Sequence, residues 1–141
     1  MTIITLDLSS ATMAGGADGR FSESLVNLPF GKRVKVISVV SLVSIANASI
    51  SPYMYVYSNL INNKSYDSVT NGTTNLLQAI DLVNHISSAG VSTYYTDSNM
   101  FQFDTVIPEN ITIEKRTGIG RTLLNDATSF HIRICMEVVD D

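Results

Sequence analysis

The segment 130–138 of this chain alternates between apolar and polar side chains without interruption, in the order Phe-His-Ile-Arg-Ile-Cys-Met-Glu-Val. Successive side chains on a β-strand point to opposite faces, so one face of this segment is apolar and the other is polar. Such a strand is stable when a second layer covers its apolar face. The segment therefore predicts a half-buried strand in a layered fold. The predicted core residues are Ile111, Ile113, Ile132, Ile134, Met136 and Val138.

Other segments also have the features of strands, because they are short, rich in β-branched or aromatic residues and separated by turn residues. Together the predicted strands are 2–8, 21–28, 33–45, 53–61, 76–83, 91–96, 100–107, 110–116 and 129–139. Strands at this short spacing predict an all-β sandwich or barrel. The intervening segments 9–20 and 62–75 are predicted loops, the second with an Asn-Gly turn at 71–72. The length of 141 residues fits one domain over 1–141.

Two of the predicted strands are irregular. In the segment 33–45 the alternation slips by one residue near 37–40, which predicts a β-bulge or a change of sheet. In the segment 76–83, Leu76, Leu77, Ile80 and Val83 also fit the apolar stripe of a helix. We expect a strand there because the neighbouring segments are strands, and a helix is the open alternative.

The composition describes a chain with few charges and one cysteine. Charged residues make up 16% of the sequence and the net charge is −4, so binding to nucleic acid through a basic field is not expected. The low charge content fits a surface covered by other subunits, and it fits equally a surface rich in serine, threonine and asparagine. Cys135 has no partner for an intrachain disulfide, and we expect a packed small side chain there.

No targeting or membrane-spanning segment is predicted. The N-terminal residues have neither a basic start nor a long apolar core, as a signal peptide would. The longest apolar stretch, 34–50, is interrupted by polar residues and falls short of the ~20 residues that span a membrane. We therefore expect no membrane span.

The segment 53–61 places three tyrosines on one face of a predicted strand, at positions 53, 55 and 57. Half-buried aromatic residues of a sandwich strand and a contact between subunits both explain this pattern, and the two are compatible. A platform for stacking nucleic-acid bases would need basic neighbours, and this strand has none.

No catalytic or metal-binding constellation is recognisable in the sequence. His85 and His131 lie far apart and belong to no cluster with metal-ligand spacing. The sequence Gly118-Ile119-Gly120-Arg121 resembles part of a phosphate-binding loop, but without a following helix and lysine it predicts a turn. We predict no enzyme activity, no catalytic, cofactor-binding or metal-binding residues, and no cofactor.

The order of the segments carries a further signal. A turn at 28–32 leads into a long apolar strand, and an aromatic strand follows that ends in Tyr-Ser-Asn-Leu-Ile at 57–61. Asn-Leu-Leu follows at 75–77, and Ile-Thr-Ile at 111–113 precedes the long closing strand. Over 21–139 this order resembles the jelly-roll capsid proteins of double-stranded DNA viruses. The resemblance is strongest to the penton and minor capsid proteins of virophages, polinton-like viruses and their relatives.

The resemblance implies a single jelly-roll β-sandwich of about eight antiparallel strands, arranged as two four-stranded sheets. It also implies a structural capsid subunit without catalysis, which forms a homo-oligomer, expected to be a pentamer, and contacts a major capsid protein. Its location would be the virion capsid, after assembly inside the host cell. Virophage pentons carry an inserted outer domain that this chain lacks, so the penton and another minor capsid position are both open.

A binding module offers an alternative function. A receptor- or glycan-binding β-sandwich of a viral spike or fibre would need a site on a loop. The polar segments 9–20 and 62–75 are the candidates, with Tyr66 and Asp67 as the residues to test.

Overall fold

The computed structural model describes residues 2–15, 19–44, 53–61, 65–81, 92–97, 104–117, 120–121, 123 and 129–139. The regular secondary structure of these residues is β-strand throughout, which confirms the predicted all-β class. The strands are β1 (Ile3–Ser9), β2 (Ala14–Gly15), β3 (Arg20–Ser24), β4 (Arg33–Ser44), β5 (Tyr53–Ser58), β6 (Ser65–Asp67), β7 (Gly72–Thr74), β8 (Leu76–Asp81), β9 (Ser92–Asp97), β10 (Asp104–Val106), β11 (Asn110–Thr117) and β12 (Ser129–Val138). In the described part of the chain, no helix is long and apolar enough to cross a membrane.

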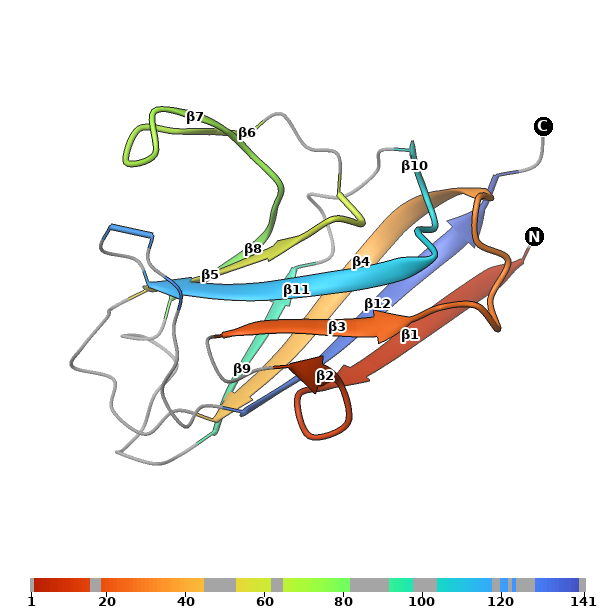
Figure 1. Ribbon diagram of the computed structural model, residues 1–141, viewed down its shortest axis with the longest axis horizontal. Helices are drawn as coiled ribbons and strands as arrows, with labels where there is room; N and C mark the ends of the chain where they lie inside the picture. Colours follow the sequence, from red (N-terminus) through yellow and green to blue (C-terminus); the bar gives the residue numbers. More distant parts are fainter. Residues whose placement is uncertain are drawn as a thin grey trace.

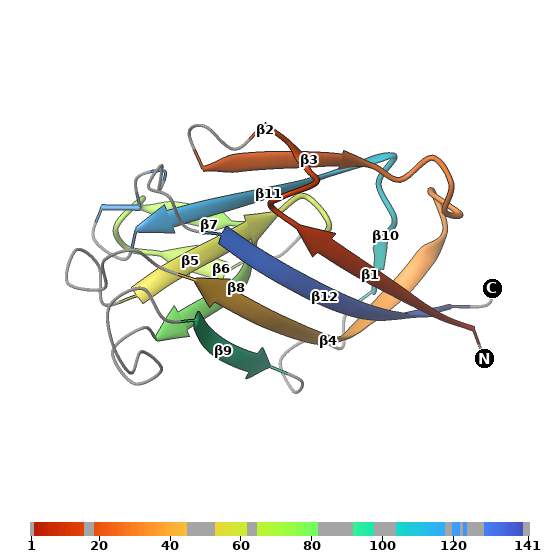
Figure 2. The same ribbon diagram turned by 90° about the horizontal axis from the view of Figure 1, so that it is seen from below.

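Two antiparallel sheets form the two layers of the molecule. The first sheet has the order β1–β12–β4–β10, and β9 also pairs with β4. The second sheet has the order β2–β3–β11–β5–β8. Figures 1 and 2 show these sheets as separate layers, with β3 and β11 crossing β4 and β12. The strands β6 and β7 form a separate two-stranded hairpin.

This strand order is that of a jelly roll. The chain passes repeatedly between the two sheets, so that β1 pairs with the last strand, β12, and β3 pairs with β11. A double-sheet jelly roll has eight strand positions in two Greek keys. The strands β9 and β10 pair with different ends of β4, at 39–44 and 33–35, and therefore share one edge position.

The expected two four-stranded sheets need a correction, because the described residues form two five-stranded sheets. One additional strand arises because the edge position beside β4 is divided between β9 and β10. The other is β2, which pairs with β3 inside the segment predicted as a loop. Gly15 permits this pairing, because its φ is +85° and an added Cβ would lie 2.8 Å from the Arg20 carbonyl oxygen.

The core lies between the two sheets, as the alternation of the closing strand predicted. On β12, Ile132, Ile134 and Met136 are buried, and Val138 is half-buried and packs against them. Ile111 and Ile113 on β11 are buried in the same cluster from the other sheet. Burial of each such side chain stabilises the folded state by roughly 1.5–3 kcal/mol.

A β-bulge accounts for the irregular alternation of β4. Cys135 of β12 pairs with Ser38, and the next residue, Met136, pairs with Val36. Ile37 is therefore the additional residue, as the sequence predicted. The bulge allows Val36 and Val39 to be buried on the same face despite their odd spacing.

A second bulge explains the ambiguous pattern of the segment 76–83. The segment is a strand, β8, over Leu76–Asp81, as expected, and residues 82–83 lie outside the described residues. Val56 pairs with Gln78 and Tyr57 with Leu76, so Leu77 is the additional residue. Leu77 and Ile80 are both buried, and their helix-like spacing results from this bulge.

Some predicted boundaries were wrong. The segment 21–28 is a strand only as far as Ser24, because the Leu28 N–H donates to the Leu25 carbonyl and forms a turn. The predicted loop 62–75 contains the β6–β7 hairpin, whose turn has Asn71 in the left-handed region at φ 56°. Asparagine tolerates this conformation better than most residues. Of the predicted strand 100–107, residues 104–106 form β10 (Asp104–Val106), and the start of the prediction, 100–103, lies outside the described residues.

Polar side chains also lie inside the sandwich. The Ser41 hydroxyl of β4 donates to the Gln78 side-chain carbonyl of β8 and links the two sheets. Lys115 follows the inward positions of β11 and is fully buried, with its Nζ 5.3 Å from the ring centre of Phe21 and 6.0 Å from that of Phe130. These aromatic faces attract the ammonium group and offset part of its desolvation.

Candidate functional site

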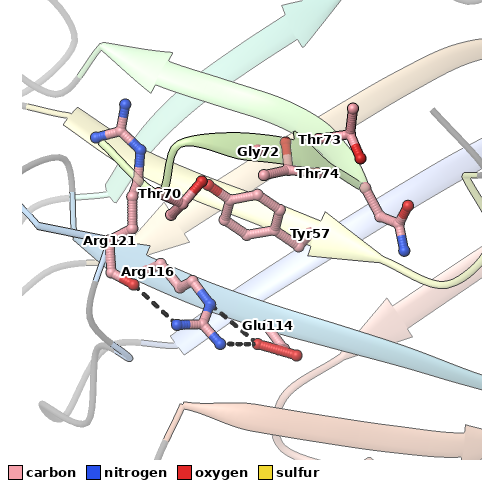
Figure 3. Close-up of a pocket in the computed structure, with 9 residues that line it drawn as sticks. Tyr57, Thr70, Gly72, Thr73, Thr74, Glu114, Arg116 and Arg121 are labelled. Carbon is pink, nitrogen blue, oxygen red and sulfur yellow. Dashed lines mark hydrogen bonds and ion pairs between the residues drawn. The ribbon is translucent and has the colours of Figure 1, made fainter. Parts of the chain in front are cut away.

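A polar cavity of about 400 Å³ lies between the β6–β7 hairpin and the outward face of β5 and β11. Figure 3 shows Thr73 and Thr74 of the hairpin on one side of the Tyr57 ring, and Glu114 and Arg116 of β11 on the other. The residues that line the cavity are Tyr57, Thr70, Gly72, Thr73, Thr74, Asn75, Glu114, Arg116 and Arg121.

The pairing of β5 with β11 brings the aromatic and charged side chains together. Glu114 pairs with Tyr57 and Arg116 with Tyr55, so the four side chains form two cross-strand pairs. Their neighbours Val56 and Lys115 point inward and are buried, which leaves the four on the outward face. Residues directly opposite on antiparallel strands lie close enough to interact.

Arg116 is held by three hydrogen bonds at the base of the cavity. Its Nε and Nη2 donate to Glu114 Oε2 at 3.0 and 2.7 Å, and its Nη1 donates to the Arg121 carbonyl at 2.8 Å. Arg20 Nε lies 3.6 Å from the other carboxylate oxygen of Glu114. The guanidinium carbon of Arg116 lies 5.9 Å from the ring centre of Tyr57. This network fixes the orientation of both Glu114 and Arg116.

Arg121 joins the hairpin to the sheet. Its Nε donates to Asp67 Oδ2 at 2.7 Å, and its guanidinium carbon lies 3.8 Å from the ring centre of Tyr55. The side chains of Arg121 and Asp67 are only 11% and 10% exposed, so water screens this ion pair little. Arg121 has a left-handed backbone, with φ 55°, in the turn that follows β11.

Asp67 also organises the turn of the hairpin. Its Oδ1 accepts a hydrogen bond from the Val69 N–H at 2.9 Å, and its carbonyl accepts one from the Thr70 hydroxyl at 3.4 Å. Desolvation by burial acts to raise the pKa of Asp67. The Val69 N–H, the hydrogen bond and charge of Arg121 and the backbone of Thr70 outweigh it and hold that pKa below its usual value.

Tyr57 carries a hydroxyl group that is buried and has no hydrogen-bond partner among the described residues. Burial raises the pKa of Tyr57, and the negative charge of Asp67 adds to this effect, so the hydroxyl keeps its proton at neutral pH. Buried polar groups are nearly always hydrogen-bonded, so a buried hydroxyl without such a partner is unusual.

Neither of the two residues named as candidates for glycan binding, Tyr66 and Asp67, lines the cavity. Asp67 supports the wall through Arg121, whereas Tyr66 is exposed and its hydroxyl donates to Asn71 Oδ1 at 2.9 Å. The expected turn at 118–121 is described at Gly120 and Arg121, while residues 118–119 lie outside the described residues. Arg121 lines the cavity.

The remaining residues of interest lie elsewhere. His131 is exposed on β12, with its Nε2 3.3 Å from Asp7 Oδ1, and Cys135 is half-buried beside Thr5. His85 lies outside the described residues. The described residues hold no group of three or more His, Cys, Asp or Glu placed to bind a metal. A second hollow of about 350 Å³ lies beside β1 and β3, next to the segment 9–20.

Sequence reasoning missed the basic neighbours of the tyrosines. It found none on the tyrosine strand itself, whereas Arg116 and Arg121 reach Tyr57 and Tyr55 from β11 and the turn after it. The alternation of 110–116 indicates that Glu114 and Arg116 point away from the core. It does not indicate which strand lies beside β11, and only that pairing brings the charges to the rings.

No protein-family model matches this sequence, and no curated protein matches it. Among solved structures, the chain is similar to that of tomato aspermy virus, with 14% identity and a TM-score of 0.37 over 99% of this chain and 79% of the other. It is also similar to the VP2 subviral particle of infectious bursal disease virus, with 14% identity and a TM-score of 0.38 over 97% of this chain and 32% of the other.

A third similar structure is the K3 cleaved adhesin domain of Lys-gingipain from Porphyromonas gingivalis, with 12% identity and a TM-score of 0.33 over 84% of this chain and 62% of that chain. The chain thus spans about a third of VP2 and under two thirds of the adhesin domain. At these scores the likenesses carry no argument about family or activity, and the fold follows from the strand order of the chain itself.

Proposed function

We propose that this protein is a structural viral capsid protein that assembles with copies of itself. Within that role, we propose a penton or another minor capsid subunit, with a pentamer as the expected oligomer and a major capsid protein as the neighbour. Its place would be the virion capsid, after assembly inside the host cell, and the role requires no catalysis and no cofactor.

The strand order is the observation that carries this proposal. The pairs β1–β12 and β3–β11, with β4 and β5 as the next strands of their sheets, are the jelly-roll arrangement that viral capsid domains use. Lectin domains and other proteins use it as well, so the order alone does not determine function. The order of sequence segments, which resembles capsid proteins, favours the capsid role among these.

An exposed apolar surface at one end of the sandwich supports assembly. Val26, Phe30 and Val106 are 54%, 49% and 47% exposed, respectively. Val26 and Phe30 lie in the β3–β4 connection, and Val106 lies on β10 (Figure 1). The Gly31 N–H donates to the carbonyl of Ile107, the residue after β10, so the two segments adjoin. We call these three side chains the apolar end. Exposed apolar side chains on adjoining segments are a feature of many protein interfaces.

The oligomeric state of the purified chain tests the proposal. Native mass spectrometry and light scattering across a concentration series should show a closed oligomer, and negative-stain microscopy should show a ring or a shell. Coexpression with the neighbouring major capsid protein should give a complex that survives gel filtration. A strict monomer at high concentration that binds no capsid partner would rule out the capsid role.

A second function, receptor or glycan recognition, is favoured by one specific observation. The cavity under the β6–β7 hairpin is lined by hydroxyl, amide, carboxylate and guanidinium groups. A subunit that only fills a shell needs no such cavity. Recognition and assembly are compatible, since the cavity and the apolar end are formed by different residues.

A further inference from the structure

We propose that β1 forms a contact between copies of this chain, in which the outer edges of two β1 strands pair antiparallel about a two-fold axis. The sheets that contain β1 in the two copies would then form one continuous sheet. The inference deepens the proposed self-assembly, on which it rests, and it names a second contact besides the apolar end. The partner at this edge is a second copy of the chain and not a peptide of another protein.

The outer edge of β1 is identified from its hydrogen bonds to β12. β1 is the last strand of its sheet and pairs with β12 on one side (Figure 2). The Val138 N–H donates to the Thr2 carbonyl, and the Ser10 N–H donates to the Phe130 carbonyl. Bonded and non-bonded positions alternate along an antiparallel pair, so the even-numbered residues of β1 bond to β12 and the odd-numbered ones face away from it.

The odd-numbered residues Ile3, Thr5 and Asp7 therefore turn their N–H and C=O groups to the outside. None of these groups has a backbone partner among the described residues. The next odd-numbered residue, Ser9, differs, because its carbonyl accepts two N–H groups of the turn that follows β1. We call Ile3, Thr5 and Asp7 the free edge, and each of the three offers one donor and one acceptor.

Space for a neighbouring strand lies alongside the free edge. The hollow of about 350 Å³ is lined by residues 5–9 of β1 and also by Thr12, Glu23 and Leu25. Consecutive residues of a strand point to opposite faces, so a hollow that touches all five residues 5–9 lies along the edge of the strand and not over one face. In the described part of the chain, no strand pairs with β1 on this side.

β1 lacks the features that keep edge strands from pairing with other chains. Such strands are short, or they carry bulges, proline, lysine or an inward-pointing charge. β1 has seven residues, Ile-Ile-Thr-Leu-Asp-Leu-Ser, and pairs with β12 without a register shift. Its one charged side chain, that of Asp7, is exposed and accepts a hydrogen bond from Arg133 Nε at 2.8 Å. By contrast, the edge strand β2 has two residues and the edge strand β8 carries the bulge at Leu77.

The free edge is complementary to itself, which selects a second copy as its partner. With Thr5 opposite Thr5 of the second copy, Ile3 of each copy lies opposite Asp7 of the other. Each opposing pair exchanges two hydrogen bonds, so every N–H and C=O of the free edge finds a partner. Opposite threonines are a favourable cross-strand pair, and no like charges face each other. A register centred on Asp7 would oppose two carboxylates, and one centred on Leu6 would use the Ser9 carbonyl, which is already bonded.

The symmetry of this contact places it between rings. A two-fold contact joins two copies and cannot by itself close a ring of five. The proposed ring needs a head-to-tail contact, for which the apolar end is the candidate. The β1 contact would thus join two copies that belong to neighbouring rings.

Disulfide cross-linking tests the register. Thr5→Cys is combined with Cys135→Ser, because Thr5 Oγ1 lies 3.9 Å from Cys135 Sγ and a bond within the chain must be prevented. The Cα atoms of a bonded antiparallel pair are about 5.5 Å apart, which suits a disulfide. Mild oxidation should therefore convert this variant to a covalent dimer. Ile3→Cys with Cys135→Ser is the matched control, because its two sites lie four residues apart along the strand, about 14 Å, and should not cross-link.

Sedimentation velocity over a concentration series tests the contact itself. Thr5→Glu places two carboxylates directly opposite each other and beside the Asp7 side chains of both copies. It should weaken the pairing at least about tenfold. Thr5 is exposed, so the melting temperature of the variant should stay close to that of the parent.

The β1 contact can be measured alone when the apolar end is blocked. The double variant Phe30→Glu and Val106→Glu should remain a dimer through β1, and addition of Thr5→Glu should convert this dimer to a monomer. Thr73→Glu is the matched control, because it makes the same replacement at an exposed strand position on β7. Its addition to the double variant should leave the dimer unchanged.

Each outcome separates the β1 contact from the proposed function. If the parent assembles but Thr5→Glu changes nothing, or if positions 3 and 5 cross-link equally, the β1 contact is wrong and self-assembly stands. A dimer that Thr5→Glu dissociates, and that forms nothing larger, would support the β1 contact and count against the capsid role. A parent that stays monomeric at every concentration would reject both, and would leave the free edge to a strand of another protein.

Discussion

At the scale of single residues, the contact between Asp67 and Arg121 decides where the hairpin lies. Exposed ion pairs contribute little to stability because water and salt screen them. This pair is largely buried, its Arg121 stacks on Tyr55, and Asp67 also accepts the Val69 N–H of the hairpin turn. A single side chain thus connects the turn of the hairpin to the sheet behind it.

Acid should release the hairpin from the sheet. The folded pKa of Asp67 is below its unfolded value of about 3.9, so its contribution to stability is complete above that pH. The contribution is lost as the pH falls through the folded pKa, when the carboxylate is protonated and its ion pair with Arg121 ends. The protection of the Val69 and Thr70 amides against hydrogen exchange, measured relative to an unstructured peptide at the same pH, should therefore decrease below about pH 4. Asp67→Asn should show the lower protection already at pH 7.

Asp7→Asn provides the control for this experiment. The hydrogen bonds from Arg133 and then from His131 also lower the pKa of Asp7, but Asp7 is exposed and lies on β1, in the other sheet. Its replacement should leave exchange in the hairpin unchanged at every pH. Equal effects of the two replacements would show that net charge, and not the contact between Asp67 and Arg121, holds the hairpin.

At the scale of elements, the alternation of β12 determines which of its faces enters the core. The strand pairs with β1 on one side and with β4 on the other, and its alternate side chains enter the core. Alternation alone was sufficient to predict which face is buried. The bulge at Ile37 was predictable as well, because it leaves a visible slip in the pattern. The bulge at Leu77 was not, since it produces the same spacing as a helix.

Ile134→Asn should destabilise the fold severely. The Ile134 side chain is completely buried, and its replacement removes apolar packing and leaves an amide without a partner in the core. We expect the free energy of unfolding to fall by about 3–5 kcal/mol. Urea denaturation followed by circular dichroism measures this change.

Arg133→Asn, one residue earlier on β12, is the matched control for that replacement. Arg133 is exposed and points to the opposite face, so the same new side chain should cost little there. If the Ile134 variant unfolds at the same urea concentration as the parent, the assignment of inner and outer faces is wrong.

At the scale of the whole molecule, the jelly roll brings distant segments to the same place. The β3–β4 connection and β10 lie far apart in sequence, but both belong to the apolar end of the sandwich. The cavity under the hairpin is assembled from β5, β7, β11 and the turn after β11. The apolar end and the cavity each draw residues from several segments, so no local sequence motif indicates either of them.

Charges at the apolar end should prevent assembly without unfolding the chain. The double replacement Phe30→Glu and Val106→Glu changes two exposed side chains, so the melting temperature should stay close to that of the parent. The oligomer should dissociate, because burying the two carboxylates in an interface would be costly. Sedimentation velocity measures the change.

Val69→Glu is the control for the apolar end, because Val69 is exposed to a similar degree but lies at the tip of the hairpin. It should assemble like the parent. If the double variant assembles over the same concentration range as the parent, the contact between subunits lies elsewhere on the surface.

The sequence by itself determined the class of fold, most strand positions and the buried face of the closing strand. These properties depend on the period of the side chains along one segment, which the sequence displays directly. Only the tertiary structure decided that Tyr57 lies beside Glu114 and Arg116, and that Asp67 forms an ion pair with Arg121. Such contacts depend on which strand becomes the neighbour of another, and the pairing is set by packing across the whole sandwich rather than by any local pattern.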